Sequence, residues 1–534
     1  MKLNKQRLIL LGLILVILVV LDYLFGMTYN FENAGTIVYI GFWIIVIAGV
    51  LFIDPAHYKQ FNRTFLIVAA TVIGLMVIGG LSSSQFFRAK AYADVIGDVE
   101  EVQFIDLYGS NHVIEMSYVD KDSAIAAAEK RIGELSEVSS RFEIDSEEFS
   151  QINYQGKMVR VAPFQYTDTI KEYMNYSQGV PYYVIVTTGD GNTNAVAEIV
   201  KLEESMKYYP GAPLNYNLMR HVSYSNKFSY LDDWYFEIDD NGHPYWLVQA
   251  VDHKVGLWGG KSMSALVIVD AVSGEVKRYG LDEIPEWVDT VYPTDMLLNQ
   301  AKDHYTLSGG FLNSVFQQRN VMAIDREEGS YNYVSIDEEI YVFTGIRPIK
   351  VDSTSTTGML FISKRTGKAI ELKLPGVSLA AAENTATGSI QEKNYATTTP
   401  VLQNVSGYPT YVMSLKDTSG VVRGFALVNY QDYTKSAVGS TLKEAQTNYG
   451  AVMGSQNDVN PIETKTISGV LESIQPVTID GNTYYLLRLT GDSTIYQANL
   501  SINYELAFLK NGTFLTLTHA GNTVSTLTIT AKAE

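Results

Sequence analysis

Three apolar runs at the N-terminus set the strongest limit on how this chain can fold. They are Leu8–Phe25, Thr36–Ile53 and Phe65–Leu81. A helix that crosses a hydrocarbon layer of ~30 Å, at a rise of about 1.5 Å per residue, needs roughly 20 mainly apolar residues. Each run comes within a few residues of that length. The sequence therefore predicts a transmembrane region with three helices within residues 1–85.

The distribution of basic residues predicts the orientation of these helices. Three basic residues precede the first run and two lie between the second and third, whereas residues 26–35 hold no Lys or Arg. Loops that stay in the cytoplasm carry an excess of Lys and Arg. We therefore expect a multi-pass protein of the cell membrane, with a cytoplasmic N-terminus and with residues 83–534 outside the cell.

Two features inside the runs raise questions of their own. Asp22 is the only ionisable residue well inside a predicted span. Such residues often belong to proton or ion relays, but we expect Asp22 to reach the membrane interface, since no other ionisable residue within the spans offers it a partner. Ala70 and Gly74 form a small-xxx-small pair, which lets helices approach closely. We expect this pair to pack the three spans together.

The composition of the remaining chain narrows the classes of partner. The whole chain has a net charge of −18 and no cysteine. An acidic surface repels nucleic acid, so we expect no nucleic-acid partner. Without cysteine, neither disulfides nor thiolate metal sites can form. An exported chain without disulfides fits a bacterial cell surface, and we predict no cofactor.

The outer part of the chain has the composition of a strand-rich protein. Tyr is frequent, with 36 residues, and Thr, Val and Ile recur in short alternating runs. Helical patterns cover Asp122–Glu137, a stretch from Pro293 to about Tyr305, and a stretch from Ser440 that Gly450 should end. We predict a multi-module α+β ectodomain with two regions, residues 86–290 and 291–453.

A strand–turn–strand unit recurs in this ectodomain. The first copy is Leu266–Tyr279 and the second is Leu360–Leu372, with Gly274 aligned on Gly367. A looser third copy is Val412–Val428. Each copy predicts a hairpin whose turn needs a glycine with positive φ between two half-buried strands.

The first hairpin resembles that of PepSY-type domains. Residues 269–276 read VDAVSGEV and follow the apolar strand Trp246–Val251. PepSY-type domains pair a helix with a small antiparallel sheet that ends in such a turn. They are common in membrane-attached bacterial proteins outside the cytoplasm, often as inhibitory or binding modules. The resemblance implies an interaction module, although the second copy lacks the Asp-Ala pair.

The C-terminal piece resembles a small OB-type β-barrel. Residues 454–465 are polar and read as a linker, and a short helical run at 502–509 lies between the third and fourth of five strand-like runs. OB folds often bind single-stranded nucleic acid through a basic groove. Acidic residues outnumber basic ones here, so no such partner is expected. The five strand-like runs are 466–474, 483–489, 493–500, 513–518 and 524–530.

One acidic stretch resembles the first half of a calcium loop. Glu237, Asp239 and Asn241 alternate and Gly242 follows, but the twelfth position, which should be Glu, is Val248. The flanking segments have strand patterns, which favours a hairpin turn with solvated acids as the alternative. The three residues stay as weak calcium candidates.

The stretch 256–262 reads GLWGGKS and is similar to a phosphate-binding loop. The first glycine of that motif is missing, because Val255 stands in its place, and a strand pattern follows where the motif needs a helix. We therefore expect a mobile, exposed turn instead of a nucleotide site. Trp258 in this turn is a candidate contact with a partner or with the membrane interface.

No catalytic signature occurs in the chain, and we assign no catalytic residue. We predict a non-catalytic binding, scaffolding or regulatory protein of the bacterial cell envelope. Its partners would be the lipid bilayer and an envelope or membrane protein, and an oligomer is compatible with that role. The alternatives are an extracellular hydrolase or its regulator, and a membrane-anchored structural subunit of a surface assembly.

Overall fold

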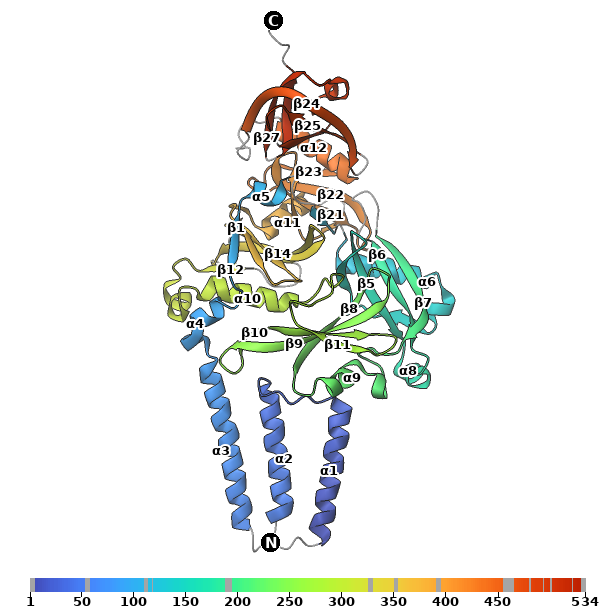
Figure 1. Cartoon of the computed structure of the whole chain (residues 1–534), viewed down its shortest axis with the longest axis vertical. Helices are drawn as coiled ribbons and strands as arrows, with labels where there is room; N and C mark the ends of the chain where they lie inside the picture. Colours follow the sequence, from blue (N-terminus) through green and yellow to red (C-terminus); the bar gives the residue numbers. More distant parts are fainter. Residues whose placement is uncertain are drawn as a thin grey trace.

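The computed structural model places three helices below a strand-rich ectodomain (Figure 1). Of the expected linker, residues 455–464 lie outside the described residues. The structure describes residues 5–52, 58–109, 114–117, 119–187, 195–324, 330–349, 354–389, 395–454, 465–479, 482–492, 494–499, 502–520 and 522–529.

The three N-terminal helices agree with the predicted spans. They are α1 (Lys5–Phe25), α2 (Ala34–Phe52) and α3 (Tyr58–Ser82). Each holds at least 18 residues that are apolar enough to cross a membrane. Their side chains are largely exposed, as expected of helices whose solvent is lipid. The prediction of three membrane-spanning helices is confirmed by length and composition.

The small residues of α3 do not pack the spans as expected. Ala70 is exposed, and a Cβ on Gly74 would meet nothing within 4 Å. The close approach between α2 and α3 lies elsewhere, at Gly41, where an added Cβ would come within 2.7 Å of Val72 Cγ2. The glycine that permits contact is therefore on α2, and the Ala70–Gly74 prediction is wrong.

The ectodomain is built from short helices and antiparallel sheets. Its α-helices are α4 (Gln85–Ala93), α5 (Phe104–Tyr108), α6 (Lys121–Gly133), α7 (Ser136–Ser139), α8 (Thr169–Asn175), α9 (Leu218–Ser225), α10 (Thr294–Leu307), α11 (Leu379–Gly388) and α12 (Leu442–Gly454). Its shorter helical turns are η1 (Leu214–Tyr216), η2 (Asn313–Gln317) and η5 (Tyr504–Phe508).

Among the described residues, the strands before the C-terminal piece form four sheets and one two-stranded ladder. One sheet holds β3 (Phe142–Ile144), β4 (Ser150–Tyr154), β5 (Lys157–Tyr166), β6 (Val180–Thr187) and β7 (Val196–Met206). The next holds β8 (Tyr230–Ile238), β9 (Pro244–Val255), β10 (Gly259–Asp270) and β11 (Val276–Tyr279). The largest holds β1 (Val99–Val102), β2 (Ile114–Met116), β12 (Met322–Ile324), β13 (Tyr331–Ile336), β14 (Glu339–Pro348), β16 (Gly358–Ser363) and β17 (Ala369–Leu372). The fourth holds β19 (Ala396–Thr397), β20 (Val401–Val405), β21 (Tyr408–Lys416), β22 (Val422–Asn429) and β23 (Ser436–Gly439), and the ladder pairs β15 (Ser355–Thr356) with β18 (Gly376–Val377).

A module of one helix and four antiparallel strands occurs three times. It comprises α9 with β8–β11, then α10 with β13, β14, β16 and β17, then α11 with β20–β23. In each module the helix packs its apolar side chains on its own sheet. The repeat is therefore a complete helix-and-sheet unit, of which the predicted hairpin is the last part.

The turn before the last strand is built alike in all three modules. The side chains of Asp270, Ser363 and Asn429 each accept hydrogen bonds from the backbone N–H groups two and three residues further on, at 2.8–3.2 Å. The carbonyl oxygen of the following residue then accepts from a backbone N–H in the segment that leads to the module's helix, two residues before α10 and α11 but ten before α9. Tyr208 donates to Ala271 at 3.0 Å and Tyr292 to Lys364 at 2.8 Å. The corresponding pair in the third module is Val377 and Tyr430, at 2.7 Å.

These hydrogen bonds correct the third copy of the predicted hairpin. Residues Val412–Val428 do form a hairpin, and Gly420 has φ +77°. The counterpart of the first two hairpins, however, is the next one along the chain, β22–β23, whose turn starts at Asn429. Matching the stretches by their turn glycines does not identify the β22–β23 hairpin, because its turn contains no glycine. Gly274 and Gly367, in the turns of the first two hairpins, have φ +79° and +72°.

The expected division into two ectodomain regions differs at its start. The strand β1 pairs in parallel with β17, and β2 pairs with β13. The strands β1 and β2 therefore belong to the sheet of the second region, although both lie within residues 86–290, the expected first region. One core joins β3–β7 to the first module, and another joins the second module to the third.

The C-terminal strands pair in a ring. They are β24 (Lys465–Ile479), β25 (Asn482–Leu489), β26 (Ile495–Asn499), β27 (Phe514–Ala520) and β28 (Thr523–Ile529). The order of pairing is β24-β25-β26-β28-β27, and β27 pairs back onto β24. The predicted order of three strands, a short helical turn and two strands is observed.

The predicted ectodomain helices are observed with different ends. The first predicted helix is divided into α6 and α7, and α10 begins after Pro293 as expected. Thr441 Oγ1 accepts from Glu444 N at 3.1 Å at the start of α12, as a capping box requires. The helix continues through Gly450 to Gly454, so the expected stop at Gly450 is wrong.

Candidate functional site

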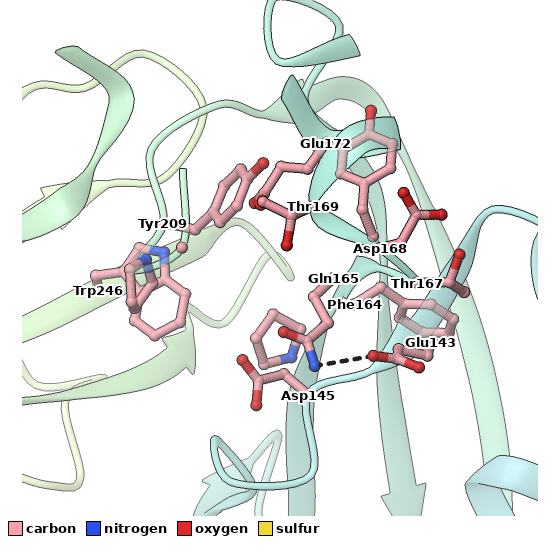
Figure 2. A pocket seen from close by; sticks show the side chains of 14 residues that line it. Glu143, Asp145, Phe164, Gln165, Thr167, Asp168, Thr169, Glu172, Tyr209 and Trp246 are labelled. Atoms are coloured by element: carbon pink, nitrogen blue, oxygen red, sulfur yellow. Dashed lines mark hydrogen bonds between the residues drawn. The ribbon is translucent and has the colours of Figure 1, made fainter. Parts of the chain in front are cut away.

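An acidic pocket opens where β3, β5 and α8 meet the loop before η1. Its volume is about 260 Å³. Figure 2 shows the side chains that line it, which come from segments far apart in the sequence. Its carboxylates are Glu143, Asp145, Asp168 and Glu172, and its aromatic side chains are Phe164, Tyr166, Tyr209 and Trp246.

Only part of the negative charge in this pocket is balanced. Asp168 caps α8, because its Oδ1 accepts from Lys171 N at 2.8 Å, and Lys171 Nζ lies 3.1 Å from its Oδ2. Glu143 accepts one hydrogen bond from the uncharged Gln165 amide, at 3.3 Å (Figure 2). Asp145 Oδ1 accepts from a backbone N–H in its own loop, at 3.3 Å. Among the described lining residues, no Lys or Arg is present.

The pKa values of Asp145 and Glu172 shift in the opposite direction to that of Asp168. Burial raises the pKa of Asp145, with a smaller contribution from the neighbouring Glu143 and Glu147 charges. Burial also raises the pKa of Glu172. The Lys171 backbone hydrogen bond lowers the pKa of Asp168 instead. A cation entering the pocket would therefore gain most from Asp145 and Glu172.

One buried donor on the pocket wall has no hydrogen-bond partner among the described residues. The Trp246 side chain is 1% exposed, and its Nε1–H makes no hydrogen bond there. A buried donor without an acceptor costs free energy. The wall thus combines carboxylates, aromatic rings and one unused indole donor, which suits a ligand with an amine and a nearby acceptor oxygen.

The described lining of the pocket contains no Ser, His or Lys side chain, and its hydroxyls are those of Thr167, Thr169, Tyr166 and Tyr209. Hydroxyls and carboxylates can act as nucleophiles only where a base or a shifted pKa activates them. The arrangement is suited to binding a positively charged group.

Two of the three calcium candidates, Glu237 and Asp239, use their carboxylates within the protein, and the third, Asn241, donates its backbone N–H to Asp239. Glu237 is fully buried, and its two carboxylate oxygens accept from the backbone N–H groups of Asp289 and Thr290 at 3.0 and 2.8 Å. Asp239 Oδ1 accepts from the backbone N–H groups of Asn241 and His243, both at 2.9 Å. The β8–β9 turn is therefore a hairpin turn, as the alternative interpretation predicts. Glu237 is not solvated, however, and its hydrogen bonds connect the end of β8 to the loop before α10.

No metal cluster replaces that candidate. Within the part of the chain that the structure describes, no group of three or more His, Asp or Glu side chains could hold a metal ion. The structure thus places no metal ligands around Glu237, Asp239 or Asn241.

Trp258 lies at the junction with the membrane helices and is half-buried. Its ring contacts α3 at Gly79, where an added Cβ would come within 2.2 Å of the ring. Its Nε1 donates to Phe31 O at 3.2 Å and its backbone N–H to Ser83 Oγ at 2.8 Å. The turn is less exposed at Trp258 than expected, because the β9–β10 hairpin packs against the end of α3, whereas the neighbouring Leu257 is 41% exposed.

No motif in the sequence predicts the acidic pocket. Its residues lie at 143–145, 163–169, 172, 209–211 and 246, and none of these segments has a motif. The one local signal was the spacing of Asp168 and Lys171, which is typical of a helix start. Only the packing of β3, β5 and α8 brings the carboxylates together.

Comparisons with known proteins show no family for this chain. No protein-family model matches the sequence, and no curated protein matches it. Among solved structures, a levansucrase mutant from Bacillus subtilis is 8% identical and covers 82% of this chain and 98% of its own. Its TM-score is 0.14, a value too low to support any conclusion about fold or function.

Proposed function

We propose that the chain is a non-catalytic, membrane-anchored binding protein of the bacterial cell envelope, with residues 83–534 outside the cell. The observation that supports it most is the acidic pocket, held on an ectodomain whose first module contacts α1, α3 and the α1–α2 loop. The chain's negative charge and lack of cysteine agree with an outer location. The bias of Lys and Arg toward the N-terminus and the second loop agrees with this orientation.

The pocket is suited to a basic side chain of a partner protein. Asp145 and Glu172 face it without a Lys or Arg among the described lining residues, and Tyr209 offers an aromatic face. A lysine ammonium would lower the free-energy cost of ionising these half-buried carboxyl groups, and it could contact an aromatic ring. A partner in the envelope would then dock by one inserted lysine.

The modules support a binding role as well. Each module pairs a helix with a four-stranded antiparallel meander, which is the arrangement of the PepSY-type domains that the first hairpin resembles. The C-terminal piece has the strand order of an OB-type barrel. We propose PepSY-like modules and an OB-like barrel as the two kinds of interaction unit in the ectodomain.

The ligand proposal is tested with two matched small molecules. We expect acetyl-lysine-methylamide, with a free side-chain amine, to bind the full chain in nanodiscs, and acetyl-norleucine-methylamide, which lacks the amine, not to bind. Glu172→Gln and Asp145→Asn should weaken binding, whereas Glu203→Gln, an exposed acid on β7, should not. Equal heats for both molecules in calorimetry would contradict the pocket's role.

The orientation is tested separately. Since the native chain has no cysteine, Ser419→Cys in the exposed β21–β22 turn and Lys59→Cys at the start of α3 report opposite sides of the membrane. In intact cells, a membrane-impermeant maleimide should label the first and not the second. Labelling of the second alone would overturn the outer location of the ectodomain.

A further inference from the structure

Exposed apolar side chains gather where the spans meet the ectodomain. They come from the α1–α2 loop, the start of α4, the region around α9 and the tip of the β9–β10 hairpin. Each is more than a third exposed. We call them the interfacial belt: Phe31, Phe86, Phe87, Tyr224, Phe228 and Leu257.

Contacts to α1 place one half of the belt beside the end of that span. Lys227 Nζ lies 2.9 Å from Asp22 Oδ2 of α1 and 5.7 Å from the ring centre of Tyr224. The carbonyl oxygen of Phe228 accepts from Asn30 Nδ2 in the α1–α2 loop at 3.1 Å. Tyr224 and Phe228 therefore lie beside the outer end of α1, as the position of α9 in Figure 1 also indicates.

Contacts to α3 fix the other half. Leu257 stands between Gly256, which packs on the backbone of Ser82, and Trp258, which packs on Gly79. Phe86 and Phe87 open α4, whose N-cap is Ser84, so only two residues separate α3 from α4. Phe86 and Phe87 therefore lie close to the end of the third span.

Phe31 joins the two halves. It lies in the loop between α1 and α2, and its carbonyl oxygen accepts from Trp258 Nε1 at 3.2 Å. The belt thus touches the outer ends of all three spans. Exposed apolar side chains grouped in this way mark a surface that is covered in use.

We infer that the interfacial belt lies in the headgroup layer of the bilayer, so that the ectodomain rests on the membrane surface. Aromatic side chains are favoured at this depth, where an apolar ring meets both lipid and water. The occupant follows from continuity with the spans, because the belt begins where their apolar length ends. The ectodomain would then have a fixed height and tilt above the lipid.

The inference is tested by single-cysteine labelling, which the cysteine-free chain permits. Phe228→Cys and Leu257→Cys are labelled with nitrobenzoxadiazole in phosphatidylcholine vesicles that contain nitroxide lipids. Phe508→Cys is the matched control, because Phe228 and Phe508 are 81% and 82% exposed but Phe508 lies in the C-terminal barrel region, far from the spans.

We expect blue-shifted emission at positions 228 and 257, with stronger quenching by a nitroxide near the headgroup than by one at the chain end. Position 508 should show neither effect. Tyr224→Cys serves if one variant fails to fold, as judged by circular dichroism. Emission and quenching at position 228 equal to those at 508 would overturn the inference and point to a protein partner as the cover. These vesicles test the belt whichever side of a cell the ectodomain occupies.

Discussion

Lys227 in the ectodomain forms an ion pair with Asp22 at the outer end of α1, with 2.9 Å between Nζ and Oδ2. The other carboxylate oxygen of Asp22 accepts from the Tyr29 hydroxyl at 2.7 Å. Lys227 Nζ also donates to the carbonyl oxygen of Met27 at 2.8 Å. The charge in the first span is thus held by the ectodomain, which explains why Asp22 needs no partner in another span.

Removing one member of this pair should loosen the ectodomain from α1. Lys227→Met leaves a half-buried carboxylate with one donor, so we expect a loss of stability on the order of 1–3 kcal/mol. The midpoint of thermal unfolding in detergent micelles measures it. The double variant with Lys227→Met and Asp22→Asn should lose little more stability than Lys227→Met alone. Lys157→Met, an exposed lysine on β5, is the control, and an equal midpoint for both lysine variants would contradict the pair's role.

The contact between Gly79 and Trp258 gives a second prediction. A Cβ at position 79 would come within 2.2 Å of the Trp258 ring, so Gly79→Ala must displace the indole. Overpacking of this kind costs about 1–3 kcal/mol. We expect a lower unfolding midpoint and a shift in Trp258 emission.

The neighbouring glycine provides the control for that experiment. A Cβ on Gly80 would meet nothing within 4 Å, so Gly80→Ala should leave both readouts unchanged. In a Trp258→Ala background, Gly79→Ala should cause no further loss of stability, because the methyl group then has room. Equal effects of the two alanine variants would show that the β9–β10 hairpin does not rest on α3.

The parts of the fold that the sequence predicts correctly depend on neighbouring residues. The three spans follow from continuous apolar length, and the hairpins at Gly274 and Gly367 from a glycine between two alternating strands. The predicted third hairpin, Val412–Val428, is one hairpin too early, because Asn429 forms the same turn without glycine. A side-chain acceptor at the turn's first position, shared with Asp270 and Ser363, is the pattern that would have found it.

The candidate site depends on contacts between distant residues. Trp246, Tyr209 and Glu172 line one pocket from a strand, a loop and a short helix, and nothing local links them. Trp258 is predicted to be a contact residue because it is aromatic and lies in a glycine-rich turn. The residue on which it packs, Gly79, is in a membrane helix. Which surface such a residue contacts follows from the packing of α3 on the first module, which no local pattern encodes.

Two glycines should respond to alanine with opposite signs. Gly274 has φ +79°, and an added Cβ would come within 2.3 Å of the Tyr208 ring, so Gly274→Ala should destabilise by about 1–3 kcal/mol. Gly450 is exposed inside α12 with nothing within 4 Å of an added Cβ, so Gly450→Ala should stabilise by about 0.5–1 kcal/mol. Chemical denaturation measures both. A stabilising Gly274→Ala would contradict the turn that defines the modules.

The pH dependence of stability should reveal a buried carboxyl group at Glu148. Its Oε1 accepts from Trp234 Nε1 at 2.9 Å, and burial, helped by Asp145 and Asp233, raises its pKa from 4.5 to about 7. Because the folded pKa is above the unfolded one, the protonated group stabilises the fold fully below 4.5, and this contribution is lost as the pH rises through about 7.

Glu148→Gln keeps an acceptor for the indole and carries no charge. We therefore expect Glu148→Gln to be more stable than the native chain by on the order of 2 kcal/mol at about pH 8.5, and nearly equal to it at about pH 4. The fluorescence of Trp234 should titrate near pH 7 in the native chain and stay constant in Glu148→Gln, with Trp234→Phe identifying its share of the signal. A native chain whose stability relative to Glu148→Gln rises between pH 6 and 8 would reverse the sign and show that the carboxylate, not the acid, is the form held against Trp234.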